Sequence, residues 1–332
     1  MKKLGMFWKF AMCAAVFAAD GVDVFAADGV TQEILIANEI EWGGGTTNWV
    51  DGDLVVTYTN ATDGFYVPGV ATVDILEVGG GGGGGRVCNT NSTDYGGGGG
   101  GGGGGVVTNK GLLKLKGRYT ITVGRGGAAA EYVKDGWAEG GDGGNTFITN
   151  DKDGSNVMEV AIGGGGGGAL SAGHNGGCGG GGSKNVTESN GGVGSQGYDG
   201  GIGKAKFQGA SGGGAGSVGK STSKIANPVK AGDGLAISIS GTEVYYAGGG
   251  VGGHSHSAIN DRVSNRRSKG GGGTGGGGET DDDAHPATDG IDGLGGGGGG
   301  GGRLVAATAG RGGCGVLIIR ITSYVEKEDA AE

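Results

Sequence analysis

The chain has 332 residues, of which 93 are glycine and only 3 are proline. This composition excludes a collagen triple helix, which needs glycine at every third position with abundant proline between. Apolar residues make up 35% of the chain, too few for a large hydrophobic core. The formal net charge of -9 is spread without a basic block, so we expect no nucleic-acid partner.

The N-terminal segment has the pattern of a secretory signal peptide, which we predict to cover residues 1–26. Three lysines flank the start of a short apolar stretch at residues 10–19, and small residues suited to cleavage follow up to Ala26. Asp20 and Asp23 interrupt this stretch before it reaches the roughly 20 apolar residues of a membrane helix. The sequence therefore predicts a protein that is secreted or displayed at the cell surface, without an integral membrane span.

Segments rich in β-branched residues recur along the rest of the chain and predict strands. An N-terminal β element is predicted for residues 27–64, and a turn at residues 65–70 follows it. A short acidic tail, residues 323–332, ends the chain. No segment after the signal has the 3.6-residue apolar period of an amphipathic helix. The predicted strands are, in chain order, residues 33–41, 53–59, 72–78, 112–123, 145–149, 156–162, 235–247 with a turn at Gly241, and 315–322.

Uninterrupted glycine runs follow several of these strands, the longest at residues 79–85, 96–105, 163–168 and 295–302. Flexible linkers normally mix glycine with serine, proline or charged residues. An extended threefold helix of the polyproline II type has no internal hydrogen bonds, and bare backbones pack closely only where no Cβ intervenes. We therefore predict a mainly β fold with a polyglycine II helix bundle edged by β-strands, and little α-helix outside the signal. Small domains joined by disordered linkers are the alternative.

Three segments of this pattern resemble the glycine-rich domain family. They are residues 66–78 leading into the first glycine run, residues 119–124 midway, and residues 312–320 at the end. That family includes phage tail-fibre adhesin tips, secreted bacterial proteins and the extracellular glycine-rich region of anaplastic lymphoma kinase. The resemblance covers residues 65–322 and implies a polyglycine II bundle whose function is binding. A signal peptide, without a kinase domain or membrane helix, favours bacterial secretion or surface display.

Loops between the glycine helices are the candidate binding sites, since aromatic and arginine side chains dominate binding hot spots. Some of these side chains would alternatively cap the ends of glycine helices. We expect a cell-surface glycan or protein as the partner, and a self-assembling structural coat or matrix protein as the alternative function. The candidate ligand-binding residues are Tyr95, Tyr132, Trp137, Tyr198, Arg262, Arg266 and Arg267.

Three cysteines follow the signal: Cys88, Cys178 and Cys314. They lack the paired spacing of zinc sites. Export to an oxidising compartment favours one disulfide, for which Cys88 with Cys178 is the candidate pair, although three pairings are open. Buried free thiols are the equally supported alternative.

Two further motifs have a chemical interpretation and a structural one. Residues 214–221 match a phosphate-binding loop, but no apolar strand precedes them, so nucleotide binding is not predicted. His254, His256 and His285, with the acidic residues 281–283, would offer metal ligands if their loops converged, whereas solvated loops are the simpler interpretation. No catalytic constellation is present, so we predict a protein that is not an enzyme and needs no cofactor.

Overall fold

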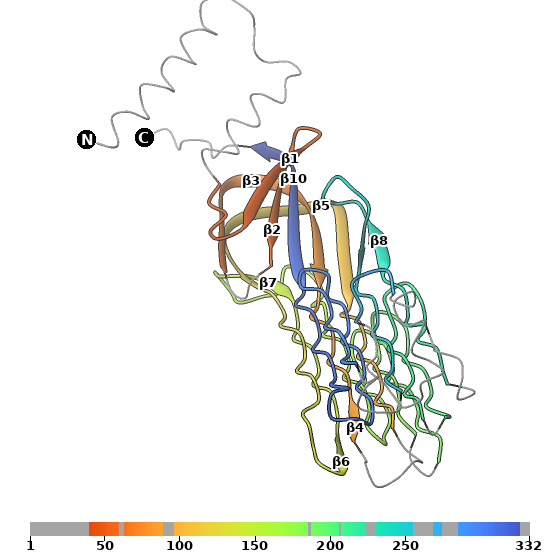
Figure 1. The fold of residues 1–332 in the computed structure, drawn as a ribbon. Helices are drawn as coiled ribbons and strands as arrows, with labels where there is room; N and C mark the ends of the chain where they lie inside the picture. The colour runs from red at the N-terminus through yellow and green to blue at the C-terminus, as the bar shows by residue number, and fades with distance from the viewer. Residues whose placement is uncertain are drawn as a thin grey trace, which may run out of the picture.

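The computed structural model describes residues 40–59, 63–88, 96–184, 187–205, 207–222, 230–254, 268–273 and 285–325. A β-sheet forms one end of the molecule, and a bundle of extended segments runs away from it (Figure 1). The described residues contain strands and extended segments but no helix, so the predicted mainly β fold is confirmed.

Six antiparallel strands form the main sheet, in the spatial order β1-β2-β10-β3-β5-β7. The strands are β1 (Thr46–Val50), β2 (Asp53–Tyr58), β3 (Asp63–Val78), β5 (Val106–Thr122), β7 (Phe147–Asn150) and β10 (Val316–Val325). The last strand in sequence, β10, lies between β2 and β3, so both ends of the described chain meet in one sheet. Two smaller sheets pair β4 (Arg86–Cys88) with β6 (Gly136–Ala138) and β8 (Leu235–Ile237) with β9 (Val244–Tyr246).

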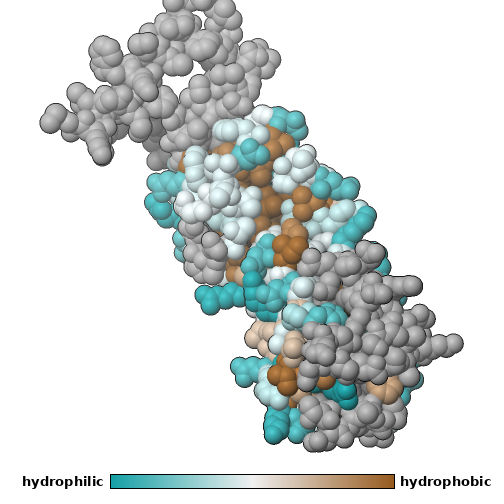
Figure 2. All heavy atoms as spheres, viewed as in Figure 1, coloured by the Kyte–Doolittle hydropathy of each residue, from teal (hydrophilic) through white to brown (hydrophobic). Residues whose placement is uncertain are grey.

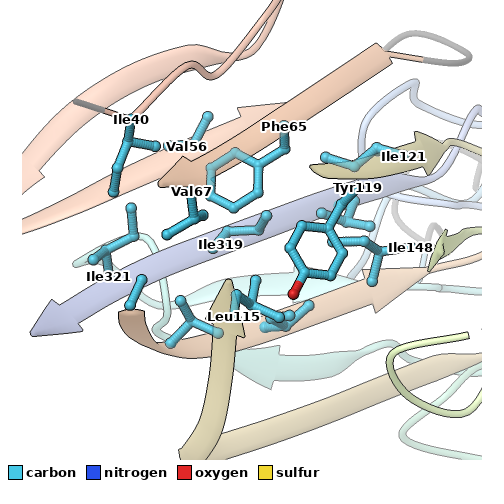
Figure 3. Close-up of a cluster of buried hydrophobic side chains, with 14 of the residues drawn as sticks. Ile40, Val56, Phe65, Val67, Leu115, Tyr119, Ile121, Ile148, Ile319 and Ile321 are labelled. Atoms are coloured by element: carbon cyan, nitrogen blue, oxygen red, sulfur yellow. The ribbon is translucent and has the colours of Figure 1, made fainter. Parts of the chain in front are cut away.

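Successive side chains of the main sheet point to opposite faces and belong to two different hydrophobic clusters. On β10, Ile319 and Ile321 belong to the larger cluster, and Ile318 belongs to the smaller one. This follows from the two-residue period of a strand. The larger cluster also contains Phe65 and Tyr119, whose ring centroids are 6.4 Å apart (Figure 3). The apolar residues that the composition supplies are therefore concentrated at the sheet end of the molecule.

Two local predictions are wrong. Residues 65–70 form part of β3 instead of a turn, and the pairing of β3 with β5 shifts register between Val67 and Ala71 to accommodate Pro68 and Gly69. The Gly69 amide donates to the Tyr324 hydroxyl at 3.0 Å, so the irregular stretch stays attached to the sheet. Residues 156–162 make only isolated bridges to the β7 segment, and no strand.

Each glycine run is an extended segment with a hydrogen-bond repeat of three residues. The amides of residues 79–85 donate to three antiparallel segments in turn, and the carbonyls of residues 80–85 accept from three parallel ones. Every third residue therefore faces the same neighbour, as a threefold polyglycine II helix requires. The donors pair 79, 82 and 85 with residues 99–105, 80 and 83 with residues 141–144, and 81 and 84 with residues 310–313.

The run at residues 98–105 is surrounded in the same way. Its six hydrogen-bonded neighbours are residues 79–85, 162–168, 178–181, 210–213, 250–253 and 295–301. Two adjacent glycine helices thus form the centre of a hexagonally packed bundle, in which each central backbone has six partners. This pairing satisfies the amides and carbonyls that a bare buried backbone would otherwise leave without hydrogen bonds.

The central runs need glycine because of close packing, and not because of unusual backbone angles. None of the glycines at 79–85 or 98–105 has a positive φ. A Cβ added at any position of 79–85 or 98–104 would lie 1.9–2.4 Å from a backbone carbonyl oxygen of a neighbouring segment. Real atoms do not approach that closely, so a single methyl group would force two backbones apart.

Outer helices of the bundle carry side chains on the side that faces solvent. The guanidinium of Arg311 bonds both carboxylate oxygens of Asp292 at 2.8 and 2.9 Å, and this pairing lowers the pKa of Asp292 and raises that of Arg311. His174 lies between Asp142 and Glu139, at 2.8 and 3.0 Å. Burial alone would lower the pKa of His174, but the two carboxylates together raise it above its ordinary value. Charged pairs therefore join outer helices laterally.

Candidate binding surface at the far end of the bundle

The end of the bundle away from the main sheet is built around Arg86. The first glycine run continues directly into β4, which pairs with β6 so that Val87 lies opposite Trp137 (Figure 1). The Arg86 side chain is buried, and its Nη2 donates to the carbonyls of Leu304 and Val305 at 3.0 and 2.7 Å. One guanidinium thereby connects the first glycine run to the turn after the run at 295–302.

A tyrosine covers the same arginine. The Arg86 guanidinium carbon lies 5.1 Å from the centroid of the Tyr132 ring, a cation–π contact. Burial lowers the pKa of Arg86, while interactions with Cys88 and Tyr132 offset part of that effect. Tyr132 precedes a tight turn in which the Gly136 amide donates to the Val133 carbonyl at 3.1 Å. The loop at residues 131–135 is thus held at both ends.

Four exposed apolar side chains lie on the segments that Arg86 and the β4–β6 pair connect. Their exposed fractions are 45% for Tyr132, 44% for Val133, 58% for Trp137 and 55% for Val305. We call these four residues the tip cluster. Hydrophobic residues are visible beside hydrophilic ones at this end of the molecule in Figure 2. Exposed apolar side chains that gather at one place, unlike ones scattered singly, are a feature of binding surfaces.

The candidate ligand-binding residues predicted from the sequence do not all lie on one surface. It places Tyr132 and Trp137 together in the tip cluster. Tyr198 is 50% exposed, but its carbonyl accepts from Gly179, nearer the main sheet. At about 3.1 Å per residue, Tyr198 is about 15 Å from the level of Trp137 along the bundle axis. Tyr95, Arg262, Arg266 and Arg267 lie outside the described residues.

Two members of the tip cluster, Val133 and Val305, were not predicted from the sequence, and neither was the role of Arg86. Single valines in loops give no pattern that separates surface from core. The one available signal was Arg86 itself, a charged residue directly after seven glycines. A residue at the end of a central helix lies where several neighbouring helices also end, which makes it a natural connection between them.

The candidate disulfide between Cys88 and Cys178 is not formed, and both residues are buried free thiols. The Cys178 amide bonds Gly103, which lies level with the start of the first glycine run, whereas Cys88 follows the end of that run. The rise of a polyglycine II helix separates the two levels by about 20 Å, and a disulfide needs Cα atoms within about 7 Å. Burial raises the pKa of the Cys178 thiol to about 12. Cys314 is also free.

The segment at residues 214–221 does not form a phosphate-binding loop. Its amides are already used within the bundle, because Gly216 and Ser217 donate to Asp233 and Gly219 donates to Asp199. A phosphate cradle needs such amides to point at the ligand. Within the part of the chain that the structure describes, no group of three His, Cys, Asp or Glu side chains is placed to hold a metal ion. The same residues contain no helix long and apolar enough to cross a membrane.

A β-sheet joined to a bundle of glycine helices, with exposed residues where the helices end, defines a glycine-rich β-protein. The chain belongs to the glycine-rich domain family, whose sequence profile matches residues 57–322. This match confirms the resemblance and begins within β2, so that it takes in strands on both sides of β10. No curated protein matches the chain.

Proposed function

We propose that the protein is an exported, non-enzymatic adhesive module that binds a cell-surface glycan or protein through its tip cluster. The observation that carries this proposal is the placement of exposed Tyr132 and Trp137 at the end of a hydrogen-bonded bundle. Aromatic residues bind both sugar rings and protein surfaces, and a rigid frame holds them with little loss of conformational entropy on binding. The N-terminal pattern at residues 1–26 supports export.

Burial of the tip arginine supports the same proposal. The Arg86 side chain contacts the Tyr132 ring and the Val305 carbonyl, and the backbone of the same strand pairs with β6. Arg86 thereby connects the 131–135 loop, β6 and the turn at Val305. Binding sites work best when their supporting residues are locked before the ligand arrives. The tip cluster would therefore meet a partner as a preformed surface.

Binding of the full secreted chain to glycan arrays, whole cells and matrix proteins tests the proposal. Trp137→Ala should weaken binding by roughly 30-fold, which corresponds to a hot-spot loss of about 2 kcal/mol. The matched control is Trp49→Ala, because Trp49 is 39% exposed on β1 in the main sheet, at the other end of the molecule. Equal binding by both variants, or no binding by the folded wild type to any of these targets, would rule the tip cluster out.

A structural coat protein is the second candidate, and β1 is the observation that favours it. This strand lies at the edge of the main sheet, and four of its five residues are exposed. Exposed edges invite pairing with another chain. Light scattering of the wild type and of Thr47→Lys separates the two functions. Concentration-dependent assembly that the lysine abolishes would favour the coat, whereas a stable monomer would favour the adhesin.

A further inference from the structure

Two histidines that are far apart in sequence meet at the far end of the bundle. His254 follows the segment 250–253, and His285 precedes the segment 287–291; their ring centroids lie 5.5 Å apart with the planes tilted by 53°. His254 is 2% exposed, and His285 is partly exposed. The Gly253 amide donates to Gly98, which places the pair level with the end of the first glycine run.

A third polar side chain lies beside them. Gln208 forms an antiparallel bridge with His254, so the two side chains leave the backbone on the same face, with Cβ atoms about 5 Å apart. Gln208 is 1% exposed, and its Oε1 has no hydrogen-bond partner among the described residues. A buried amide oxygen without a partner destabilises the fold, and a bound cation would supply the missing partner.

The spacing of the two rings suits a shared metal ion. A histidine nitrogen binds zinc at about 2.0–2.1 Å, which places the ring centre about 3.2 Å from the metal. Two such rings at the tetrahedral angle have centres about 5.2 Å apart, close to the observed 5.5 Å. Imidazole favours zinc, copper or nickel over calcium or magnesium.

We propose that His254, His285 and the Oε1 atom of Gln208 form a zinc(II) site at the far end of the bundle, with the remaining position open to water. The ion would join the segment that begins at His285 to the two segments of Gln208 and His254, which the backbone already pairs. It is independent of the tip cluster, since it uses none of its residues. Both imidazoles must be neutral to bind the metal, so acidification should release it.

Competition of the full chain with a colorimetric zinc chelator tests this site. One equivalent of Zn²⁺ should bind at pH 7.5 and dissociate at pH 5. His285→Ala should weaken binding by more than about 100-fold and Gln208→Leu by about 10-fold, because zinc prefers an imidazole nitrogen to an amide oxygen as a ligand. His285 is the preferred variant because it is partly exposed, so its replacement is compatible with folding, which thermal unfolding of each variant checks.

The matched control is His174→Ala, which removes a histidine that the structure places between two carboxylates on an outer helix. This variant should bind one equivalent with unchanged affinity. Absence of a stoichiometric zinc site in the folded wild type would overturn the proposal. Full retention of binding by folded His285→Ala would also overturn it, whatever the adhesion assays give.

Discussion

The main sheet is held together by what its side chains bury, whereas the bundle is held together by backbones that carry no side chain. In the sheet, Ile75, Ile121 and Ile319 are fully buried in one hydrophobic cluster. In the bundle, the helix at residues 79–85 has six neighbours and buries only backbone. Removing a methyl group should therefore damage the sheet, and adding one should damage the bundle.

The largest expected effect is that of one added methyl group at the bundle centre. In Gly83→Ala, the new Cβ would lie 1.9 Å from the carbonyl oxygen of Ala128. The neighbouring helices must separate and lose hydrogen bonds, so we expect a loss of at least about 5 kcal/mol in the free energy of unfolding. Urea denaturation measures it.

Gly64→Ala is the matched control for that variant, because a Cβ at Gly64 meets nothing within 4 Å. Its stability should lie within about 0.5 kcal/mol of the wild type, as for ordinary surface changes. If the two alanine variants were equally stable, the close packing of the central helices would be refuted.

The second effect concerns the junction of the two regions. Glu77, on β3 just before the first glycine run, is fully buried. Burial raises the pKa of its carboxyl to about 8. A folded-state pKa above the unfolded value means that the folded protein retains its proton longer, so stability falls as pH rises from about 4.5 to about 8.

The contribution of Glu77 to this loss is on the order of 4 kcal/mol, since one pKa unit corresponds to about 1.4 kcal/mol. Glu77→Gln should abolish this pH-dependent loss of stability. The melting temperature of the variant should therefore rise relative to that of the wild type as the pH is raised from 5 to 9. The exposed Glu131→Gln serves as the control and should follow the wild type. A parallel pH dependence in Glu77→Gln would contradict the assignment.

The smallest of the three effects is expected in the sheet. Ile121→Ala removes buried methyl groups from the larger cluster and should cost about 3 kcal/mol, with Ile121→Val costing about 1 kcal/mol. The two variants should lower the urea midpoint in proportion to the side-chain volume that each one removes. A sheet that tolerated both changes would have its stability supplied by the bundle.

The sequence predicted the general architecture because the strands and glycine runs alternate visibly. Residues 72–78 were predicted to form a strand that leads into a glycine run, and they are the last part of β3. The order of helices within the bundle was not predictable, because hydrogen bonds between identical glycines carry no pairing code. The turn expected at residues 65–70 failed for another reason. Pro68 and Gly69 signal turns locally, but the residues that flank them pair with β5, and Val70 pairs with β10, so the strand continues through them.

The candidate site was predictable only in part. Tyr132 and Trp137 were predicted as aromatic residues in loops between glycine helices, and the structure places both at the Arg86 end of the bundle. Val305 comes to the same surface through its carbonyl bond to Arg86, 219 residues away in sequence. The meeting of His254 with His285 depends likewise on which helices end side by side.

The central position of β10 also determines when this chain can fold. Its partners β2 and β3 end at Tyr58 and Val78, so they must wait for residues 316–325 before the sheet can close. The first glycine helix also cannot complete its hydrogen bonds before then, because two of its amides donate to carbonyls in residues 310–313. Contacts this distant in sequence make folding slow. A ribosome-bound chain therefore remains incomplete in both regions until its C-terminal strand has been synthesised, and the two regions then form almost together.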